Sequence, residues 1–320
     1  MPLPELPPLV VIVGPTAVGK TDLSIQLAER LDGEIVSADS RLFYRGLDVG
    51  TAKPTSAERA RVPHYLIDIA DPDQSVSLAL FQEQARQAIV AIYNRGRLPF
   101  LVGGAGQYVR AVIQGWDLPK IEPDPGLRQA LENWTAEIGS LGLHTRLASL
   151  DPSAAGKIDP RNRRRTIRAL EVILRSGRLF SAQRSRKNSP YRLLLLGLIR
   201  PREELYARLD ARLEAMLANG FVEEVQELLA QGYSPDLPAL SAIGYREIAA
   251  HLQGKITLEE AILQIKRATR IFVRRQANWF RAGAPPTGDP AIRWFQVGPG
   301  TLDDIYKIIS SWLAAEKPVV

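Results

Sequence analysis

Gly14-Pro15-Thr16-Ala17-Val18-Gly19-Lys20-Thr21 matches the pattern G-x-x-x-x-G-K-[ST] and lies between an apolar run, Leu9–Val13, and a helical pattern, Leu23–Leu31. The order of strand, glycine-rich loop and helix is the context in which this pattern forms a phosphate-binding loop. Backbone N–H groups and a helix N-terminus converge there on an anion, Lys20 adds a positive charge, and the Thr21 hydroxyl can hold Mg²⁺. The stretch therefore predicts a site for a phosphorylated ligand without saying which ligand it is.

Short apolar runs alternate with amphipathic stretches along the first third of the chain. The predicted strands are Leu9–Val13, Glu34–Ser37, Tyr65–Ile69 and Pro99–Val102, and the predicted helices include Lys20–Leu31 and Leu78–Asn94. This alternation is typical of a parallel sheet with helices on both faces. A later apolar run, Leu193–Ile199, predicts another buried strand that returns to the sheet.

A proline-rich break at residues 117–125 separates this α/β core from a helical, arginine-rich stretch. We therefore expect a P-loop NTPase-like α/β core with a parallel sheet, interrupted by a helical insertion. The core is predicted to comprise residues 9–117 and 192–313, the second part being mostly helical, and the insertion to comprise residues 118–191. Residues 283–290, which include two adjacent prolines, predict a loop.

The composition excludes several classes of site. The chain has 320 residues and no cysteine, so it contains neither disulfides nor cysteine-based zinc sites. Its three histidines, His64, His144 and His251, are too few to favour a histidine metal site. The sequence shows no signal-peptide pattern and no apolar run of membrane-spanning length, so we expect a cytoplasmic protein without a membrane partner. We expect it to be a monomer.

Positive charge is concentrated in two segments. Residues 161–187 carry ten Lys/Arg and one acid, Glu171, and residues 266–281 carry six Lys/Arg and no acid. These segments have net charges of +9 and +6, whereas the whole chain is only +6, so the rest is −9. Two concentrated basic segments in an otherwise acidic chain indicate a polyanionic partner, and nucleic acid is the partner that they favour.

The predicted second strand ends in Ser37-Ala38-Asp39-Ser40. In a doubly wound sheet the carboxyl ends of the strands face the ligand crevice, so Asp39 is expected near the phosphate loop. A carboxylate there can hold Mg²⁺ through water or act as a general base. A helix-capping or turn aspartate is the structural alternative, and the spacing leaves both interpretations open.

The other predicted strands bear on whether the chain hydrolyses ATP. A P-loop ATPase usually carries an acidic residue at the end of another apolar strand, where it helps to hold Mg²⁺. The run Pro99–Val102 ends instead in Gly103-Gly104-Ala105-Gly106, although Tyr65–Ile69 does contain Asp68. The absence of an acidic residue after Val102 weakens the case for ordinary NTP hydrolysis, but Asp68 leaves that function open.

Three basic residues are candidate phosphate ligands. Lys53 lies in a polar loop, residues 48–54, where it would meet a phosphate or else be a solvated loop lysine. Arg208 and Arg212 are four residues apart on one face of a predicted helix. That spacing suits a phosphate clamp but is also common on helix surfaces, so the sequence leaves these roles open.

Residues 261–281 form one helical pattern with two faces. Its apolar stripe contains Ile262, Ile265, Phe272 and Trp279, and another face contains Arg267, Arg270, Arg274 and Arg281. The apolar stripe is more typical of a protein core than of a base-stacking platform. A helix that packs on the core and presents arginines outward suits binding to a phosphate backbone.

An ordered series of motifs runs from the phosphate loop to residue 281. It comprises Gly14 to Thr21, Ser37-Ala38-Asp39-Ser40, Asp48-Val49-Gly50-Thr51-Ala52-Lys53-Pro54, Pro63-His64-Tyr65-Leu66-Ile67-Asp68, Arg168-Ala169-Leu170-Glu171, Arg212 with Met216, Gly220 and Glu224, Ile243-Gly244-Tyr245-Arg246-Glu247, Thr269-Arg270, Arg274-Arg275-Gln276 and Trp279-Phe280-Arg281. The series closely resembles the tRNA dimethylallyltransferases. Many enzymes share the phosphate loop alone, whereas the ordered series is specific and spans most of the chain.

The resemblance implies transfer of a dimethylallyl group from dimethylallyl diphosphate to N6 of the adenosine just 3′ of the anticodon. It implies Mg²⁺ as cofactor, the anticodon stem-loop of tRNA as partner, and tRNA binding by the insertion. The implied diphosphate-binding positions are Gly14, Thr16, Ala17, Gly19, Lys20, Thr21 and Arg212. The implied catalytic residues are Asp39 as general base, Thr21 as Mg²⁺ ligand and Arg212.

The resemblance also implies a set of tRNA-contacting positions. These are Asp39, Ser40, Arg41, Leu42, Ala105, Arg164, Arg165, Arg168, Ser241, Gly244, Tyr245, Arg246, Arg270, Arg274, Arg275 and Gln276. Two of them depart from the family pattern: Ala105 stands where threonine is common, and Leu42 where many members have glutamine.

Three alternative functions remain at this point. An adenylate isopentenyltransferase would use the same donor but a free nucleotide, which does not need two basic segments. A P-loop small-molecule kinase would use the phosphate loop for ATP. A non-catalytic RNA-binding protein would use the basic segments alone.

Overall fold

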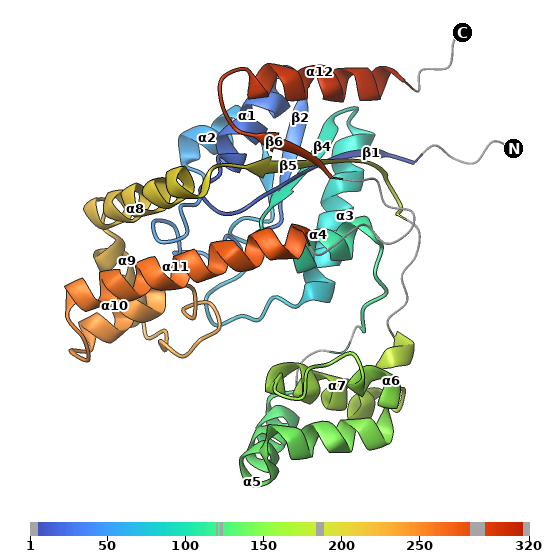
Figure 1. The fold of residues 1–320 in the computed structure, drawn as a ribbon, viewed down its shortest axis with the longest axis vertical. Coiled ribbons are helices and arrows are strands. Elements are labelled where there is room, and N and C mark those ends of the chain that lie inside the picture. The colour runs from blue at the N-terminus through green and yellow to red at the C-terminus, as the bar shows by residue number, and fades with distance from the viewer. Residues whose placement is uncertain (1–5, 120, 122–123, 184–188, 282–291, 316–320) are drawn as a thin grey trace, which may run out of the picture. The chain divides into compact units, whose positions relative to one another are not determined.

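A computed structural model gives the fold (Figure 1) and describes residues 6–119, 121, 124–183, 189–281 and 292–315, with the backbone alone at 278–281. Within these residues, six strands form one parallel sheet in the order β3-β2-β4-β1-β5-β6. They are β1 Pro8–Val13, β2 Gly33–Ser37, β3 His64–Tyr65, β4 Leu98–Gly103, β5 Arg192–Ile199 and β6 Arg293–Gln296. This sheet confirms the predicted α/β fold.

Helices cover this sheet and extend past it. They are α1 Lys20–Arg30, α2 Ser56–Arg61, α3 Leu78–Asn94, α4 Gly106–Ile113, α8 Arg202–Ala218, α9 Phe221–Ala230, α10 Tyr245–Leu252, α11 Leu258–Arg281 and α12 Thr301–Ala314. Helix α3 has its predicted bounds, and α1 ends one residue before the predicted Leu31. Within the described residues, no helix combines the length and the apolar character that a membrane crossing requires.

The central strand β1 is buried on both faces of the sheet, and residues 9–12 have no exposed surface. Alternate residues of a strand point to opposite faces. Val10 and Ile12 pack in one cluster with Leu27 of α1 and Ile305 of α12. A parallel strand covered on both faces forms a continuous apolar run, which is why the sequence predicts β1 correctly.

Two strand predictions need correction. The sequence predicts a strand over Tyr65–Ile69, but β3 ends at Tyr65. Leu66 (φ +64°) and Asp68 (φ +56°) adopt the left-handed backbone conformation, through which a strand cannot continue. Strand β6 lies in a region predicted to be mostly helical, and it pairs with β5 at the sheet edge. Three of its four residues are exposed, so no apolar run marks it in the sequence.

Helix α11 buries a stripe that differs from the predicted one. Ile265 is buried as expected, but Phe272 is 41% exposed and the neighbouring Val273 is buried instead. The prediction for Phe272 is wrong because the buried stripe runs from Ile265 through Val273 to Gln276. The side chains of Trp279 and Arg281, and the predicted loop at 283–290, lie outside the described residues.

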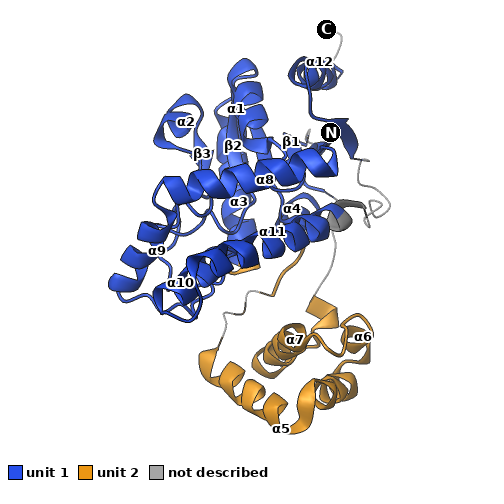
Figure 2. Ribbon diagram, turned by 60° about the vertical axis from the view of Figure 1, so that its left-hand side comes forward, with its two compact units in different colours: residues 1–76, 80–114, 189–320 blue, residues 77–79, 115–188 orange. Residues whose placement is uncertain are grey.

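The chain divides into two compact units (Figure 2). Unit 1 comprises residues 1–76, 80–114 and 189–320 and contains the sheet, and unit 2 comprises residues 77–79 and 115–188. Unit 2 contains α5 Pro125–Leu150, α6 Pro152–Ala155, α7 Arg163–Ser176 and the 3-10 helix Ser181–Gln183. The predicted insertion, residues 118–191, and unit 2 share residues 118–188.

Unit 2 is held together by an apolar cluster and a buried carboxylate. Leu143 and Leu147 of α5 pack against Leu170 of α7. Glu171 is fully buried, and its carboxylate accepts hydrogen bonds from Arg128 Nε (2.9 Å) and Arg168 NH1 (2.6 Å). Burial acts to raise the pKa of Glu171, but the two arginines outweigh it and hold the pKa below its usual range. A charged network thus joins the start of α5 to α7.

Candidate active site at the phosphate loop

The phosphate loop leaves β1 at Gly14 and enters α1 at Lys20. A Cβ at Gly14 (φ +153°) would lie 2.6 Å from the Leu198 carbonyl oxygen, so the close approach of β5 requires glycine. Gly19 (φ +104°) caps α1 in a left-handed conformation that also favours glycine. The two glycines therefore set the curve of the loop, and the first amides of α1 are free to face an anion.

Lys20 folds back over the loop. Its Nζ donates hydrogen bonds to the carbonyl oxygens of Gly14 (3.0 Å) and Pro15 (2.8 Å). Burial lowers the pKa of Lys20 to about 8. The positive charge of Arg212 adds to this shift, and the Asp39 carboxylate only partly opposes it. The three predicted site residues Lys20, Asp39 and Arg212 line the same cavity.

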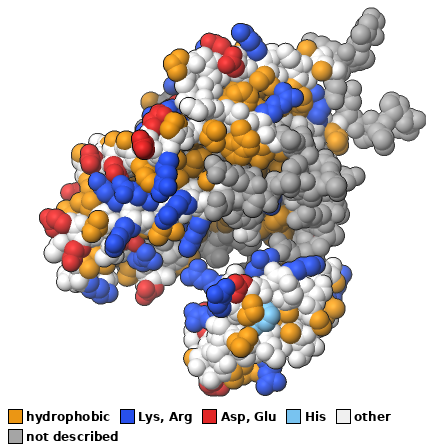
Figure 3. All heavy atoms as spheres, in the orientation of Figure 1, with side chains coloured by type: hydrophobic (Ala, Val, Ile, Leu, Met, Phe, Trp, Pro, Cys, Tyr) orange, Lys and Arg blue, Asp and Glu red, His pale blue; other side chains and the backbone are white. Residues whose placement is uncertain are grey.

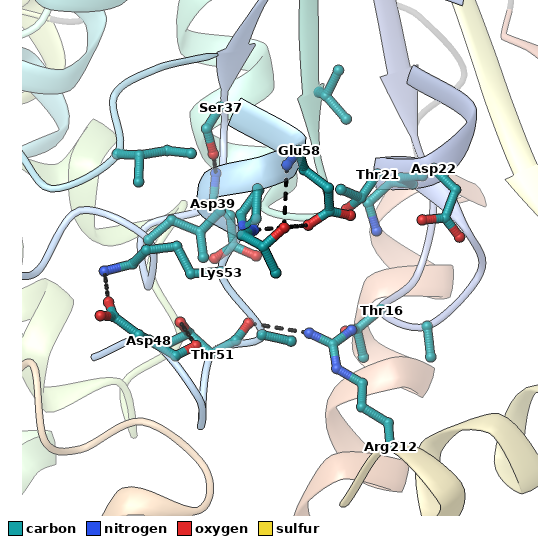
Figure 4. Close-up of a pocket in the computed structure, with 18 of the residues that line it drawn as sticks. Thr16, Thr21, Asp22, Ser37, Asp39, Asp48, Thr51, Lys53, Glu58 and Arg212 are labelled. Atoms are coloured by element: carbon teal, nitrogen blue, oxygen red, sulfur yellow. Dashed lines mark hydrogen bonds and ion pairs between the residues drawn. The ribbon is translucent and has the colours of Figure 1, made fainter. Parts of the chain in front are cut away.

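Asp39 follows the carboxyl end of β2, as the sequence predicts. Its Oδ1 accepts a hydrogen bond from the Arg41 N–H (3.0 Å), and its own N–H donates to Ser37 Oγ (3.3 Å). The side chain thus shapes a turn and also lines a cavity with the phosphate loop (Figure 4). The two interpretations left open by the sequence, a turn aspartate and a site carboxylate, are compatible in this geometry.

The cavity has a volume of about 1060 Å³ and lies wholly in unit 1. The phosphate loop and the start of α1 form one wall, with Thr16, Lys20 and Thr21 among the lining residues. Asp39 and the loop at residues 48–54 form another wall, and α8 contributes a third (Figure 4). The site therefore combines anion-binding groups with the carboxylate of Asp39, in a space larger than a diphosphate alone would fill. Asp22, Asp48 and Glu58 also line the cavity.

Two arginines of α8 reach the cavity, as their spacing suggests. Arg212 NH2 donates to the Thr51 carbonyl oxygen (3.1 Å), and burial lowers the pKa of its guanidinium. Arg208 Nε donates to the Ala17 carbonyl oxygen (2.9 Å). Both arginines therefore line the cavity. Arg212 contacts the loop at residues 48–54, whereas Arg208 contacts a carbonyl oxygen of the phosphate loop.

Lys53 has neither of the roles considered from the sequence. It is only 8% exposed, and its Nζ donates to the Tyr44 carbonyl oxygen (2.8 Å), to Asp48 and to Asp68 (2.5 Å). Asp68 also accepts from Arg59 NH1 (2.8 Å). Burial acts to raise the pKa of Asp68, but Lys53 and Arg59 outweigh it and lower the pKa. Lys53 anchors the 48–54 loop, and Asp68 is bound in an internal network.

Several predicted tRNA-contacting residues of unit 1 make internal contacts. Tyr245 has no exposed surface, so its side chain does not face a ligand in this conformation. Gln276 is 7% exposed; its Oε1 accepts from the Thr16 N–H (2.9 Å), and its Nε2 donates to the Gly104 carbonyl oxygen (3.2 Å). Arg270 forms an ion pair with Asp210 (2.8 Å).

Other predicted tRNA-contacting residues of unit 1 lie at the surface or at the cavity. Figure 3 shows Lys and Arg side chains on the face that α11 crosses, and Arg274 and Arg275 are exposed on that helix. Arg246 and Ser241 are exposed, and Leu42 lines the cavity. Ser40 and Arg41 are half-buried. Ala105 is half-buried at the N-cap of α4 and has no hydroxyl with which to cap that helix. Gly244 is buried at the N-cap of α10.

The arginines of unit 2 divide into paired and unpaired groups. Arg168 bonds to Glu171 and to the Ile121 carbonyl oxygen (2.8 Å). Arg163, Arg164 and Arg165 are exposed in the first turn of α7, and none forms an ion pair with another described residue. Cations at a helix N-terminus oppose the helix dipole, so this placement is unfavourable unless an anion binds there.

The described residues contain no cluster of three or more acidic, histidine or cysteine side chains that could hold a metal. The oxygen groups that line the cavity beside the phosphate loop include the Thr21 hydroxyl and the Asp39 carboxylate. This donor set is of the kind that Mg²⁺ accepts when a bound phosphate and water complete the coordination.

Models of known protein families match the parts of the chain that carry the cavity. A family model described as IPP transferase matches residues 42–283, and one described as Isopentenyl transferase matches residues 7–71. The tRNA dimethylallyltransferase of Roseiflexus sp. (strain RS-1) is 57% identical over 274 residues, 86% of this chain and 90% of that relative. The tRNA dimethylallyltransferase of Thermomicrobium roseum is 52% identical over 310 residues, 97% of this chain and 92% of that relative.

Solved structures of similar fold carry related names. The crystal structure of a tRNA isopentenylpyrophosphate transferase from Bacillus halodurans matches with a TM-score of 0.71 and 44% identity, covering 96% of this chain and 97% of that one. A eukaryotic dimethylallyltransferase acting on tRNA matches with a TM-score of 0.79 and 26% identity, covering 98% of this chain and 80% of that one. From the family model and these close relatives, the chain belongs to the IPP transferase family, that of the tRNA dimethylallyltransferases.

Proposed function

We propose that this chain transfers a dimethylallyl group from dimethylallyl diphosphate to N6 of the adenosine 3′-adjacent to the anticodon of tRNA. One observation carries the proposal: a phosphate loop, a carboxylate and an arginine line one cavity in a chain of this family. The N6 nitrogen attacks the allylic carbon, the carbon–oxygen bond to the diphosphate breaks, and its electron pair leaves with the diphosphate. The proton of N6 passes to a base.

The leaving group belongs in the phosphate loop. Negative charge builds on the diphosphate oxygens as the bond breaks, and donors already in place stabilise that charge. The amides of the loop, Lys20 and Arg212 supply such donors. Thr21 would hold Mg²⁺, which neutralises charge on the diphosphate when it is bound.

Asp39 is the proposed general base. It lines the same cavity as the phosphate loop, and only its Oδ1 is needed for the turn with Arg41. An exocyclic adenine amine is a poor nucleophile, so a carboxylate that takes its proton lowers the barrier. The adenosine must leave its stack to reach such a cavity.

The acceptor is proposed to be tRNA rather than a free nucleotide. The unpaired arginines at the start of α7 and the exposed Arg274 and Arg275 on α11 offer charge to a phosphate backbone, which a nucleotide does not need. We assign tRNA binding to both surfaces, that of α11 in unit 1 and that of α7 in unit 2. We expect the enzyme to act as a monomer in the cytoplasm.

An adenylate isopentenyltransferase is the second candidate, because the Isopentenyl transferase model covers residues 7–71, which hold the phosphate loop and Asp39. The test is to incubate the protein with Mg²⁺, dimethylallyl diphosphate and either unmodified tRNA, an anticodon stem-loop or AMP. Nucleosides are then analysed by mass. Prenylated adenosine from the two RNAs at far higher kcat/KM than from AMP supports the proposal, and preference for AMP overturns it. Transfer of labelled phosphate from ATP without a prenyl donor would indicate a kinase instead.

A further inference from the structure

The loop at residues 48–54 lines the cavity, and a single carboxylate from α9 holds its first three residues. Glu224 Oε2 accepts hydrogen bonds from the N–H groups of Asp48 (2.8 Å) and Val49 (2.6 Å). Its Oε1 accepts from the N–H of Gly50 (3.1 Å) and from the Tyr245 hydroxyl (2.5 Å). Three consecutive backbone amides and one hydroxyl therefore donate to one side chain. Only a carboxylate offers two oxygens that both accept hydrogen bonds in this way.

The packing around Glu224 leaves the loop little freedom. A Cβ at Gly50 would lie 2.0 Å from the Phe221 ring, so the backbone lies directly against that ring. Phe221 contacts Tyr245 edge to face, with ring centroids 5.1 Å apart. Burial, together with the charge of Glu224, raises the pKa of Tyr245, so its hydroxyl remains a donor to the carboxylate.

A second anchor holds the other end of the loop. The buried Lys53 ammonium joins the Tyr44 carbonyl oxygen, Asp48 and Asp68. Thr51 lies between the two anchors, and its hydroxyl donates to the Leu47 carbonyl oxygen (2.6 Å). The Thr51 carbonyl oxygen then accepts the hydrogen bond from Arg212 NH2 (3.1 Å).

We propose that Glu224 is a positioning residue for Arg212. By fixing the backbone of residues 48–50, Glu224 fixes the Thr51 carbonyl group, and that carbonyl group orients the Arg212 guanidinium toward the diphosphate. This contact uses one of the five N–H groups of the Arg212 guanidinium, so other N–H groups remain to contact the diphosphate. The inference rests on the proposed function for the identity of the ligand. In this role Glu224 acts through Arg212 and does not itself contact the substrate.

The test is a double-mutant cycle between Glu224→Gln and Arg212→Lys. Glutamine keeps the size of Glu224 but turns an NH₂ group toward backbone N–H donors, so the loop loses acceptors. We expect Glu224→Gln to raise the KM for dimethylallyl diphosphate and the Kd for inorganic diphosphate by about tenfold, with little change in the KM for tRNA. Tyr245→Phe removes one donor only and should give the same effect at about threefold.

The cycle separates positioning from general stability. If Glu224 acts through Arg212, Glu224→Gln adds less than about twofold in the Arg212→Lys background, because the two residues form one unit. Glu227→Gln removes an exposed charge from the same helix and should change neither constant. Additive effects in the cycle, or a loss of melting temperature in Glu224→Gln with normal diphosphate affinity, would overturn the inference.

Failure of the proposed function would be visible separately. Wild-type protein that binds inorganic diphosphate but transfers no prenyl group would refute the proposed function, while the cycle in diphosphate affinity would still decide the role of Glu224. Wild-type protein that transfers the group with additive variants would refute the inference alone.

Discussion

Asp39 is the residue on which the proposed chemistry depends most directly. Asp39→Asn keeps an oxygen that can accept from the Arg41 N–H, so the turn after β2 should persist. The amide cannot take a proton, and we expect the single-turnover rate of prenyl transfer to fall by about 10²–10⁴-fold. Filter binding should show an unchanged affinity for tRNA. Near-normal turnover in this variant would remove Asp39 from the mechanism.

Lys20 gives the site a pH dependence whose sign follows from its environment. Its pKa is lowered to about 8 in the ligand-free protein, so the ammonium is present at pH 7 and lost as the pH rises above 8. Affinity for inorganic diphosphate should therefore fall by up to about tenfold per pH unit above pH 8. Calorimetric titrations from pH 7 to pH 9.5 measure this fall.

The matched control for Lys20 is Lys20→Arg, because arginine remains charged throughout this range. It should remove most of the fall above pH 8 while it leaves the titration of diphosphate itself unchanged. Parallel pH profiles for the two proteins would show that Lys20 is not the group that titrates.

Residue roles could be predicted from the sequence where position in the fold decides them. Asp39 follows a strand whose carboxyl end must face the crevice, and the structure places it at the cavity. The role of Lys53 could not be predicted, because the pattern of its loop does not show that its ammonium group is buried among Tyr44, Asp48 and Asp68. The role of Glu224 could not be predicted, because its partners are far away in the sequence. The Glu224 carboxylate meets backbone amides 174 to 176 residues earlier, and no local pattern encodes that contact.

At the scale of helices, α11 connects the basic surface to the phosphate loop. Gln276 bridges the Thr16 N–H and the Gly104 carbonyl oxygen, whereas the next residue toward the N-terminus, Arg275, is exposed. Gln276→Ala should leave both backbone groups unpaired in the interior, at a cost of about 1–3 kcal/mol for each group. Thermal denaturation should show a lower melting temperature, and the KM for dimethylallyl diphosphate should rise.

Arg275→Ala is the contrasting variant on the same helix. It should weaken tRNA binding with little change in melting temperature or in the KM for the donor. The assignment of an internal role to Gln276 fails if its variant instead weakens tRNA binding alone, as Arg275→Ala should.

Helix α7 carries a second prediction at this scale. Arg163, Arg164 and Arg165 lie at the positive end of the helix dipole, so replacing all three with alanine should not destabilise the protein. Each lost phosphate contact should lower the slope of log K against log salt by about 1 for tRNA binding. Arg161→Ala, whose arginine is already paired with Asp159, should change the slope far less. Equal slopes for wild type and the triple variant would exclude α7 from the RNA surface.

The secondary-structure elements themselves could be predicted where burial makes the pattern continuous. Strand β1 follows from its continuous apolar run, and helix α3 follows from its apolar periodicity. Strand β3 could not be delimited, because the left-handed conformation of Leu66 arises from its surroundings and not from its residue type. Strand β6 is short and mostly exposed, so backbone pairing with β5 defines it and side-chain pattern does not.

For the whole molecule, the cavity and the basic start of α7 belong to different units. All residues that line the cavity belong to unit 1, whereas the unpaired arginines of α7 belong to unit 2. The proline-rich break and the arginine-rich composition were enough to predict an insertion, because linker composition and charge are local properties. The hydrogen bonds that hold the site together within unit 1 could not be predicted in this way, because they join segments from residue 14 to residue 276.

This division predicts the behaviour of a shortened chain. Replacing residues 115–188 with a flexible Gly/Ser linker removes the helices of unit 2 but none of the residues that line the cavity. The shortened protein should bind inorganic diphosphate with Mg²⁺ within about threefold of the wild-type affinity, because the donors of the phosphate loop are intact. Its kcat/KM for tRNA should fall by at least about a hundredfold, because the phosphate contacts of α7 are gone. A circular dichroism melt confirms that the core folds, and wild-type transfer to tRNA by that folded core would show that unit 2 does not bind the RNA.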